Sequence, residues 1–323
     1  MPQKRNVLKE VNKTLNKMEL ASGQKSLIAK IKKLKKEKNA ICLVHNYQRP
    51  EIYEVADFIG DSFALSQQAG KTNADIIVFC GVKFMAESAK ILNPSRKVLL
   101  PVLTAGCPLA EMISIEELRE LKKKYPAAAV VSYVNTTAEI KAESDVCCTS
   151  ANAVKVVDSL PNKKVIFVPD YNLAKWVELQ SSKKIIAWGG YCYIHSKVQY
   201  ENIIKAKKAQ PEAKILAHPE CDLKILEIAD AVLGTEGMLN YARNSEAKKF
   251  VIVTEEGMTT RLQKELPDKK FYSAAGVCIN QKKTHLEDVY NSLKEEKYEI
   301  NPEKGIIKKA AIALGKMIEA GRD

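Results

Sequence analysis

The feature that most constrains the fold of this 323-residue chain is a unit that occurs three times at a nearly constant spacing. Each unit begins with an apolar run, typical of a strand, that ends in polar residues. These runs are AICLVHNY (40–47), AAVVSYVN (128–135) and AKILAHPE (213–220). Because self-similarity at a fixed period is the signature of a repeated structural unit, we expect three similar parts rather than one continuous core.

Apolar runs and helix-like stretches follow one another in the same order in every unit. The middle strands are predicted at IIVF (76–79), VIFV (165–168) and FVIV (250–253). The final strands are predicted at KVLLP (97–101), KIIAW (184–188) and KKFYS (269–273). Strands that alternate with helices favour parallel sheets covered on both faces and joined by right-handed crossovers. The predicted fold class is therefore α/β, with three units that pack around a pseudo-threefold axis.

The repeat also predicts how the chain is divided. Residues 1–110 form the first unit with an N-terminal extension, residues 111–195 the second, and residues 196–323 the third with a C-terminal helix. The lysine-rich stretch 25–39 has apolar residues at helical spacing, which indicates an amphipathic helix. The C-terminal helix is expected after Pro302, because proline is favoured in the first turn of a helix.

Polar residues follow the first strand of every unit. They form pairs two positions apart, which are His45 with Tyr47, Tyr133 with Asn135, and His218 with Glu220. A small hydroxyl residue follows each second strand, and these residues are Ser62, Ser150 and Thr235. Both sets recur with the same period as the strands. Since ligands of open α/β sheets bind beyond the carboxyl ends of the strands, we expect both sets to line one central site.

A cysteine follows the final strand of each unit. These residues are Cys107, Cys192 and Cys278, which are separated by nearly equal intervals. Three thiolates at equivalent positions would meet at the junction of the units, where they suit zinc, Cu(I) or an iron–sulfur cluster. His195 is either a fourth ligand or a residue beside the ligands. The cysteines that do not recur are predicted to be structural, and they are Cys42, Cys80, Cys147, Cys148 and Cys221.

The net charge of +12 favours anionic partners, either nucleic acid or small carboxylates and phosphates. No zinc-finger spacing or other nucleic-acid signature accompanies this charge, so small anions are the expected partners. No apolar run reaches the ~18 residues that cross a bilayer, and the N-terminus lacks an apolar signal core. We therefore expect a cytoplasmic protein without a membrane partner. A zinc–thiolate enzyme and a basic nucleic-acid-binding protein stay open as alternatives.

Six stretches of the chain are more specific than any single short motif. They are HNYQRPEI (45–52), GVKFMAESAKILNP (81–94), AGCPLA (105–110), SYVNTTAEIKAESDVCCTSANAV (132–154), GGYCYIH (189–195) and AHPEC (217–221). Together they resemble the quinolinate synthase family of de novo NAD biosynthesis over nearly the whole chain. The resemblance implies three homologous αβα-sandwich domains around a pseudo-threefold axis, with the active site at their junction. It departs at Gly234–Thr235–Glu236, where many members carry a Ser–Thr pair, and at Gln281, which is commonly methionine.

The resemblance also implies a cofactor, a reaction and a set of site residues. An oxygen-sensitive 4Fe–4S cluster is expected on Cys107, Cys192 and Cys278, with one iron open to substrate. Iminoaspartate and dihydroxyacetone phosphate are expected to condense to quinolinate, phosphate and water. An enzyme that produces iminoaspartate is then an expected functional partner. The catalytic residues implied are Tyr47, Glu220, His45 and Tyr133. The substrate-binding residues implied are His45, Ser62, Tyr133, Asn135, Ser150, His218, Glu220 and Thr235.

Overall fold

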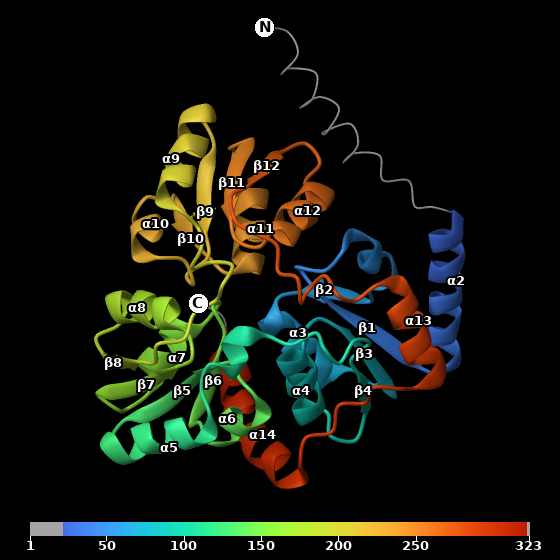
Figure 1. The fold of residues 1–323 in the computed structure, drawn as a ribbon, viewed down its shortest axis with the longest axis horizontal. Coiled ribbons are helices and arrows are strands. Elements are labelled where there is room, and N and C mark those ends of the chain that lie inside the picture. Colours follow the sequence, from blue (N-terminus) through green and yellow to red (C-terminus); the bar gives the residue numbers. More distant parts are fainter. Residues whose placement is uncertain (1–21, 322–323) are drawn as a thin grey trace, which may run out of the picture.

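The computed structural model describes residues 22–321 and contains three four-stranded parallel sheets (Figure 1). The first sheet has the order β2-β1-β3-β4, with β1 (Ala40–His45), β2 (Phe58–Gly60), β3 (Ile76–Cys80) and β4 (Lys97–Leu99). The second has the order β6-β5-β7-β8, with β5 (Ala129–Tyr133), β6 (Val146–Cys148), β7 (Lys164–Val168) and β8 (Lys184–Ala187). The third has the order β10-β9-β11-β12, with β9 (Lys214–Ala217), β10 (Ala231–Val232), β11 (Lys249–Val253) and β12 (Lys270–Ser273). The predicted α/β fold class with three repeated units is therefore confirmed.

Helices connect the strands and cover the sheets. In the first unit they are η1 (Pro50–Val55), α3 (Ser62–Lys71) and α4 (Lys83–Leu92). In the second they are η2 (Pro108–Glu111), α5 (Ile115–Lys124), α6 (Ala138–Ala142), α7 (Ala153–Ser159) and α8 (Tyr171–Gln180). In the third they are α9 (Tyr200–Ala209), α10 (Leu223–Glu227), α11 (Thr235–Asn244) and α12 (Glu256–Glu265). Polar side chains cap several of these helices; for example, Ser114 and Glu117 form a capping box at the start of α5.

One aspartate in each unit holds the first and second strands in register. Asp57, Asp145 and Asp230 each lie immediately before the second strand. Each carboxylate accepts a hydrogen bond from a backbone N–H near the start of the first strand, and the donors are Cys42, Val130 and Ile215, at 2.7, 2.7 and 2.8 Å. These aspartates recur with the period of the repeat, so the sequence carries the same structural device three times.

Two helices from opposite ends of the chain cover the first unit. The amphipathic helix predicted over 25–39 is α2 (Ser22–Glu37), and its Ile28 and Ile31 are buried. Helix α13 (Leu286–Glu295) lies beside it and adds Val289 and Leu293 to the same apolar cluster (Figure 1). The chain therefore returns to its first unit after the third sheet is complete.

The C-terminal helix α14 (Lys304–Ala320) packs between the first two units rather than on the third. It contacts α4, α6, α7 and β6, and Leu314 and Met317 are fully buried there (Figure 1). Before it, residues 298–300 add an antiparallel edge to β4 through the pairs Leu100 N–H to Tyr298 O and Ile300 N–H to Val98 O. We propose residues 110 and 195 as the boundaries between the units. Within the third range, α13 packs on the first unit and α14 packs on the first and second units. Within the described residues, no helix has both the length and the apolar character of a bilayer span.

Candidate functional site

The carboxyl ends of strands from all three sheets face one cavity. All twelve candidate site residues line it, and they are His45, Tyr47, Ser62, Cys107, Tyr133, Asn135, Ser150, Cys192, His218, Glu220, Thr235 and Cys278. They come from three units but occupy matching places in them. Because the strands of each sheet are parallel, the residues that follow them emerge at one edge, and three such edges meet at the junction.

Strand ends and helix starts position the polar side chains. His45 and Tyr133 are the last residues of β1 and β5, and His218 directly follows β9. Ser62 and Thr235 are the first residues of α3 and α11, and the carboxylate of Asp61 caps α3 by accepting from the Ala64 N–H at 2.8 Å. The site therefore offers aromatic and imidazole groups from the first strands and hydroxyl groups at the helix starts after the second ones.

Two histidines are held as neutral hydrogen-bond donors. The backbone N–H groups of Tyr47 and Glu220 donate to Nδ1 of His45 and His218, at 3.2 and 3.4 Å. This leaves Nε2 to carry the proton in each ring, and Nε2 of His218 lies 3.1 Å from Ser150 Oγ. Burial lowers the pKa of His45 to about 4 and that of His218 to about 3. Both imidazoles are therefore uncharged near neutral pH.

The carboxylate of Glu220 lies at the centre of the polar cluster and is 3 % exposed. Its Oε2 is 2.6 Å from Nδ1 of His195, and the Tyr133 hydroxyl is hydrogen-bonded to the same carboxylate. Burial by itself raises the pKa of Glu220, but the contact with His195 and the hydrogen bonds from His195 and Tyr133 outweigh burial and lower the pKa below its ordinary value. Glu220 is therefore ionised at neutral pH, as a general base must be.

A chain of hydrogen bonds joins Tyr47 to Glu220. The Tyr47 hydroxyl lies 2.6 Å from Thr254 Oγ1, and the same oxygen lies 2.8 Å from Nε2 of His195, whose Nδ1 contacts Glu220. Burial raises the pKa of Tyr47, so the phenol keeps its proton at neutral pH. A protonated phenol and an ionised carboxylate are thus linked through two intervening side chains.

The three recurring cysteines lie in loops at the cavity wall. Cys107 precedes η2, whereas Cys192 and Cys278 lie in the loops that follow β8 and β12. Backbone N–H groups point at two of the thiols: those of Leu109 and Ala110 at Cys107, and those of Ile194 and His195 at Cys192. Such donors stabilise a thiolate, although burial raises the pKa of Cys107 to about 12. Thiols with a raised pKa, such as those of Cys107 and Cys192, are poor free nucleophiles and lose their proton when a metal binds, so three thiols that line one cavity fit a metal centre.

The remaining five cysteines do not reach the cavity. All five are buried: Cys42, Cys80, Cys147 and Cys148 lie in strands of the first two sheets, and Cys221 lies in the loop between β9 and α10. They do not line the cavity, which agrees with their prediction as structural residues.

His195 reaches the cavity, and each of its ring nitrogens lies close to another polar side chain. One ring nitrogen of His195, the Sγ atom of Cys192 and a carboxylate oxygen of Glu220 all lie within 4.8 Å of one another. These distances would allow the three atoms to bind one metal ion. However, Nδ1 already contacts Glu220 and Nε2 already contacts Thr254, at 2.6 and 2.8 Å. A role beside the ligands therefore fits the geometry better than a role as a fourth ligand.

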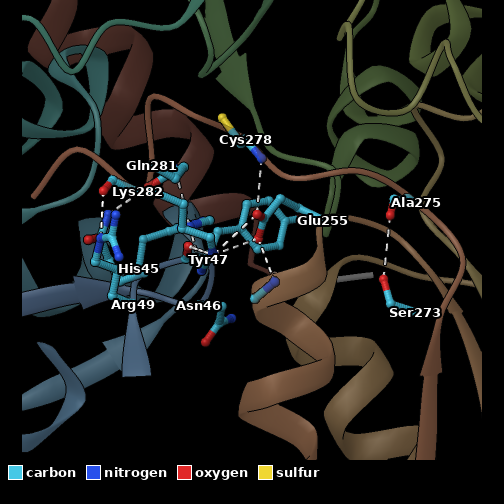
Figure 2. Close-up of polar contacts among 12 residues, drawn as sticks. His45, Asn46, Tyr47, Arg49, Glu255, Ser273, Ala275, Cys278, Gln281 and Lys282 are labelled. Carbon is cyan, nitrogen blue, oxygen red and sulfur yellow. Dashed lines mark hydrogen bonds and ion pairs between the residues drawn. The ribbon is translucent and has the colours of Figure 1, made fainter. Parts of the chain in front are cut away.

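Sequence reasoning missed several residues that line the cavity, and they are Asp61, Thr149, Tyr193, Glu255 and Gln281. The repeat carried a signal for Glu255, because it follows the third strand of its unit just as Asp170 follows the third strand of the second unit. Gln281 had no such signal. Its Nε2 lies 3.4 Å from His45 Nδ1, and its Oε1 accepts from Gln48 at 3.0 Å (Figure 2).

Known proteins of one family are similar to this chain along most of its length. A family model described as quinolinate synthetase A protein matches residues 29–319. A quinolinate synthase of Alkaliphilus metalliredigens is 52% identical over 300 residues, which cover 92% of this chain and 99% of that protein. Quinolinate synthases of Caldicellulosiruptor saccharolyticus and Methanosarcina barkeri are 51% and 50% identical over 292 and 297 residues. These alignments cover 90% and 91% of this chain and 96% and 98% of the two relatives.

Proposed function

Since this chain belongs to the quinolinate synthetase A protein family and is an enzyme, we propose that it condenses iminoaspartate with dihydroxyacetone phosphate to give quinolinate, phosphate and water. The observation that carries the proposal is the meeting of three thiols, two neutral histidines and an ionised Glu220 in one cavity. Condensation with loss of water needs acids, bases and binding sites for charged groups, and the cavity offers each of them.

The three thiols of Cys107, Cys192 and Cys278 would hold a 4Fe–4S cluster. The N–H donors at the Cys107 and Cys192 thiols support this, because hydrogen bonds to sulfur are a common feature of cluster sites. When bound through three cysteines, such a cluster supplies a Lewis-acidic iron with an open position. Zinc with His195 as its fourth ligand would require that ring to give up a close contact with Glu220 or Thr254.

The polar residues around the thiols would bind the anionic groups of the substrates. Ser62 and Thr235 offer hydroxyls at helix starts, which suit a phosphate or a carboxylate. The hydrogen on Nε2 of His45 and of His218 suits a carbonyl or carboxylate oxygen. Tyr133, Asn135 and Ser150 complete the proposed binding set.

Tyr47 and Glu220 would exchange protons with the substrates. Glu220 is ionised and accepts a proton from a carbon or an amine, while Tyr47 keeps its proton and donates it. His45 and Tyr133 orient the reacting carbonyl by hydrogen bonds. The chain through Thr254 and His195 keeps the two acid–base groups in fixed relation.

The proposed partners are small anions, in agreement with the net charge of +12. We also propose functional coupling to an enzyme that produces iminoaspartate, because an imine in water is lost by hydrolysis unless it is used soon after it forms. A reducing compartment such as the cytoplasm suits a protein in which all eight cysteines are free.

Anaerobic purification followed by a turnover assay tests this function. We expect a brown protein with broad absorption near ~400 nm that forms quinolinate from the two proposed substrates. Replacement of Cys107, Cys192 or Cys278 by serine is expected to abolish both the absorption and the turnover, because three ligands from three units hold the cluster.

Two matched cysteines serve as controls for this experiment. Cys80→Ser and Cys148→Ser change buried cysteines that do not line the cavity, so both variants should keep the cluster and the turnover. A colourless anaerobic protein with stoichiometric zinc would contradict the proposed cofactor. A Cys192→Ser variant with a full cluster and wild-type turnover would contradict the ligand assignment.

A further inference from the structure

A buried glutamate holds the loop that carries the third cysteine. Glu255 follows β11 and is 1 % exposed. Its Oε1 accepts a hydrogen bond from the backbone N–H of Cys278 at 3.1 Å, and its Oε2 accepts one from the backbone N–H of Gly257 at 2.7 Å (Figure 2). One carboxylate thus joins the start of α12 to the Cys278 loop.

A lysine extends this contact to the first unit. Nζ of Lys282 lies 3.2 Å from Glu255 Oε1 and donates to the backbone carbonyl of Tyr47 at 2.5 Å (Figure 2). The backbone carbonyl of Lys282 in turn accepts from Nε of Arg49 at 2.7 Å. The ion pair thus holds Lys282 within the cysteine loop of the third unit, and hydrogen bonds of Lys282 connect that loop to the segment that carries Tyr47.

The second unit has half of this arrangement. Asp170 occupies the position equivalent to Glu255, and its Oδ2 accepts from the backbone N–H of Cys192 at 3.1 Å. Its Oδ1 accepts from the backbone N–H of Leu173 at 2.8 Å, but no lysine or arginine of the described residues forms an ion pair with it. In the first unit the equivalent residue is Val82, which has no carboxylate. Among these three equivalent positions, only Glu255 forms an ion pair with a lysine, and that lysine also reaches the Tyr47 backbone.

We propose that Glu255 and Lys282 are a positioning pair that fixes the Cys278 loop and the Tyr47 backbone to each other. The inference rests on the proposed function, because it assumes that Cys278 is a cluster ligand and that Tyr47 is an acid–base group. Outer residues that orient metal ligands commonly change metal affinity or activity 10–100-fold when they are replaced. A buried charge that loses its partner is left uncompensated, so each residue depends on the other.

Cluster release and turnover, measured together, test the pair. Lys282→Met keeps the aliphatic stem and removes the charge, and Glu255→Gln keeps the shape and removes the charge. Iron release to a ferrous chelator under anaerobic conditions is expected to be about 10-fold faster in each variant. In samples matched for iron content, kcat should fall about 10-fold while KM changes less than about twofold, because Tyr47 is displaced and the substrate-binding groups are not.

A double-mutant cycle separates a joint role from two unrelated effects. Because the two residues act as one unit, Glu255→Gln with Lys282→Met should release iron no faster than the more severe single variant. Asp170→Asn acts on a different cysteine, so its effect on iron release should add to that of Lys282→Met. Lys264→Met is the control, because Lys264 forms an exposed ion pair with Glu54 at 2.7 Å that also joins the third unit to the first. This variant should leave iron release and kcat unchanged.

The remaining outcomes distinguish this inference from the proposed function. Additive effects of Glu255→Gln and Lys282→Met, or wild-type iron release and kcat in both, would overturn the positioning pair. If Lys282→Met fails to fold by circular dichroism, the nearly isosteric Glu255→Gln variant carries the same test by itself. A wild-type protein that binds no iron–sulfur cluster would instead refute the proposed function, whatever the variants do.

Discussion

Glu220 shows how one side chain acquires its chemistry from groups far away in the sequence. Its position beyond a first strand follows from the repeat, but its ionisation does not. His195 and Tyr133 reach it from the second unit, and His218 lies close before it in the chain. Without these groups, burial would favour the neutral acid. The immediate surroundings therefore keep a buried carboxyl ionised.

Glu220→Gln tests that interpretation. The amide has nearly the same shape but cannot accept a proton, so we expect kcat to fall about 10²-fold or more while the cluster is retained. Quinolinate formation and the absorption near ~400 nm should be measured on the same sample. Glu212→Gln, at an exposed site far from the cavity, is the matched control and should behave as wild type. Wild-type kcat in Glu220→Gln would show that the carboxylate is not the base.

At the scale of elements, helix α14 is a brace between the first two units. Its apolar face is completed by α4 of the first unit and by α6 and β6 of the second, so it stabilises their relative positions. Asn152 strengthens the attachment by donating to the last carbonyls of the helix, those of Met317 and Gly321, at 3.2 and 2.9 Å. The helix thereby supports two walls of the cavity without contributing a residue to its lining.

Leu314→Ala is expected to lower the free energy of unfolding by about 2–5 kcal/mol, because Leu314 is fully buried and its removal leaves a cavity between two units. Ile312→Ala on the same helix is the control. Ile312 is 60% exposed, so its truncation should change stability by less than about 0.5 kcal/mol. Urea denaturation of both variants gives the comparison. Equal effects of the two substitutions would mean that α14 does not brace the units.

At the scale of the whole molecule, assembly of the junction removes polar groups of all three units from water. His45 and His218 become buried and neutral there, with pKa values lowered to about 4 and about 3 from an ordinary value of 6.5. In the unfolded chain both imidazoles take up a proton near pH 6.5, whereas in the folded protein they stay neutral. The unfolded state therefore binds more protons in this range, and these two groups make stability fall as the pH falls.

The His218→Gln variant isolates this contribution. We expect wild type to lose about 1.4 kcal/mol of stability per pH unit through this histidine between pH 6 and pH 4, and the variant to lose none of it. The free energy of unfolding of the variant, relative to that of wild type, should therefore rise by about 1.4 kcal/mol for each pH unit by which the pH is lowered. Urea denaturation at several pH values, with both proteins in the same cofactor state, measures the shift. A pH-independent difference would mean that His218 is protonated in the folded protein.

Much of the architecture could be predicted because its signals are local or periodic. Strand and helix positions depend on patterns within short windows of sequence, and the period of the repeat links the three units without any knowledge of contacts. The same period places His45, Tyr133 and His218 at equivalent strand ends. Their convergence on one cavity could be anticipated, whereas their roles in the reaction stay a prediction.

Other features could not be predicted because they depend on contacts between distant parts of the chain. The sequence predicted a C-terminal helix, but only the packing shows that it rests on the first and second units. It left open how the His195 ring is placed, and only the structure shows that the ring lies against Glu220 and Thr254 of the third unit. Lys282 carried no sequence signal, because its partner Tyr47 lies 235 residues earlier.

The sequence by itself determined the α/β class, the threefold repeat and the residues that follow the strands. These depend on periodicity, which survives in the sequence because each unit must bury the same faces. The tertiary structure determines that Glu220 is ionised, what surrounds the His195 ring, and how the Cys278 loop is joined to Tyr47. Those properties arise only when burial and distant partners act on the same atom, and no local pattern records them.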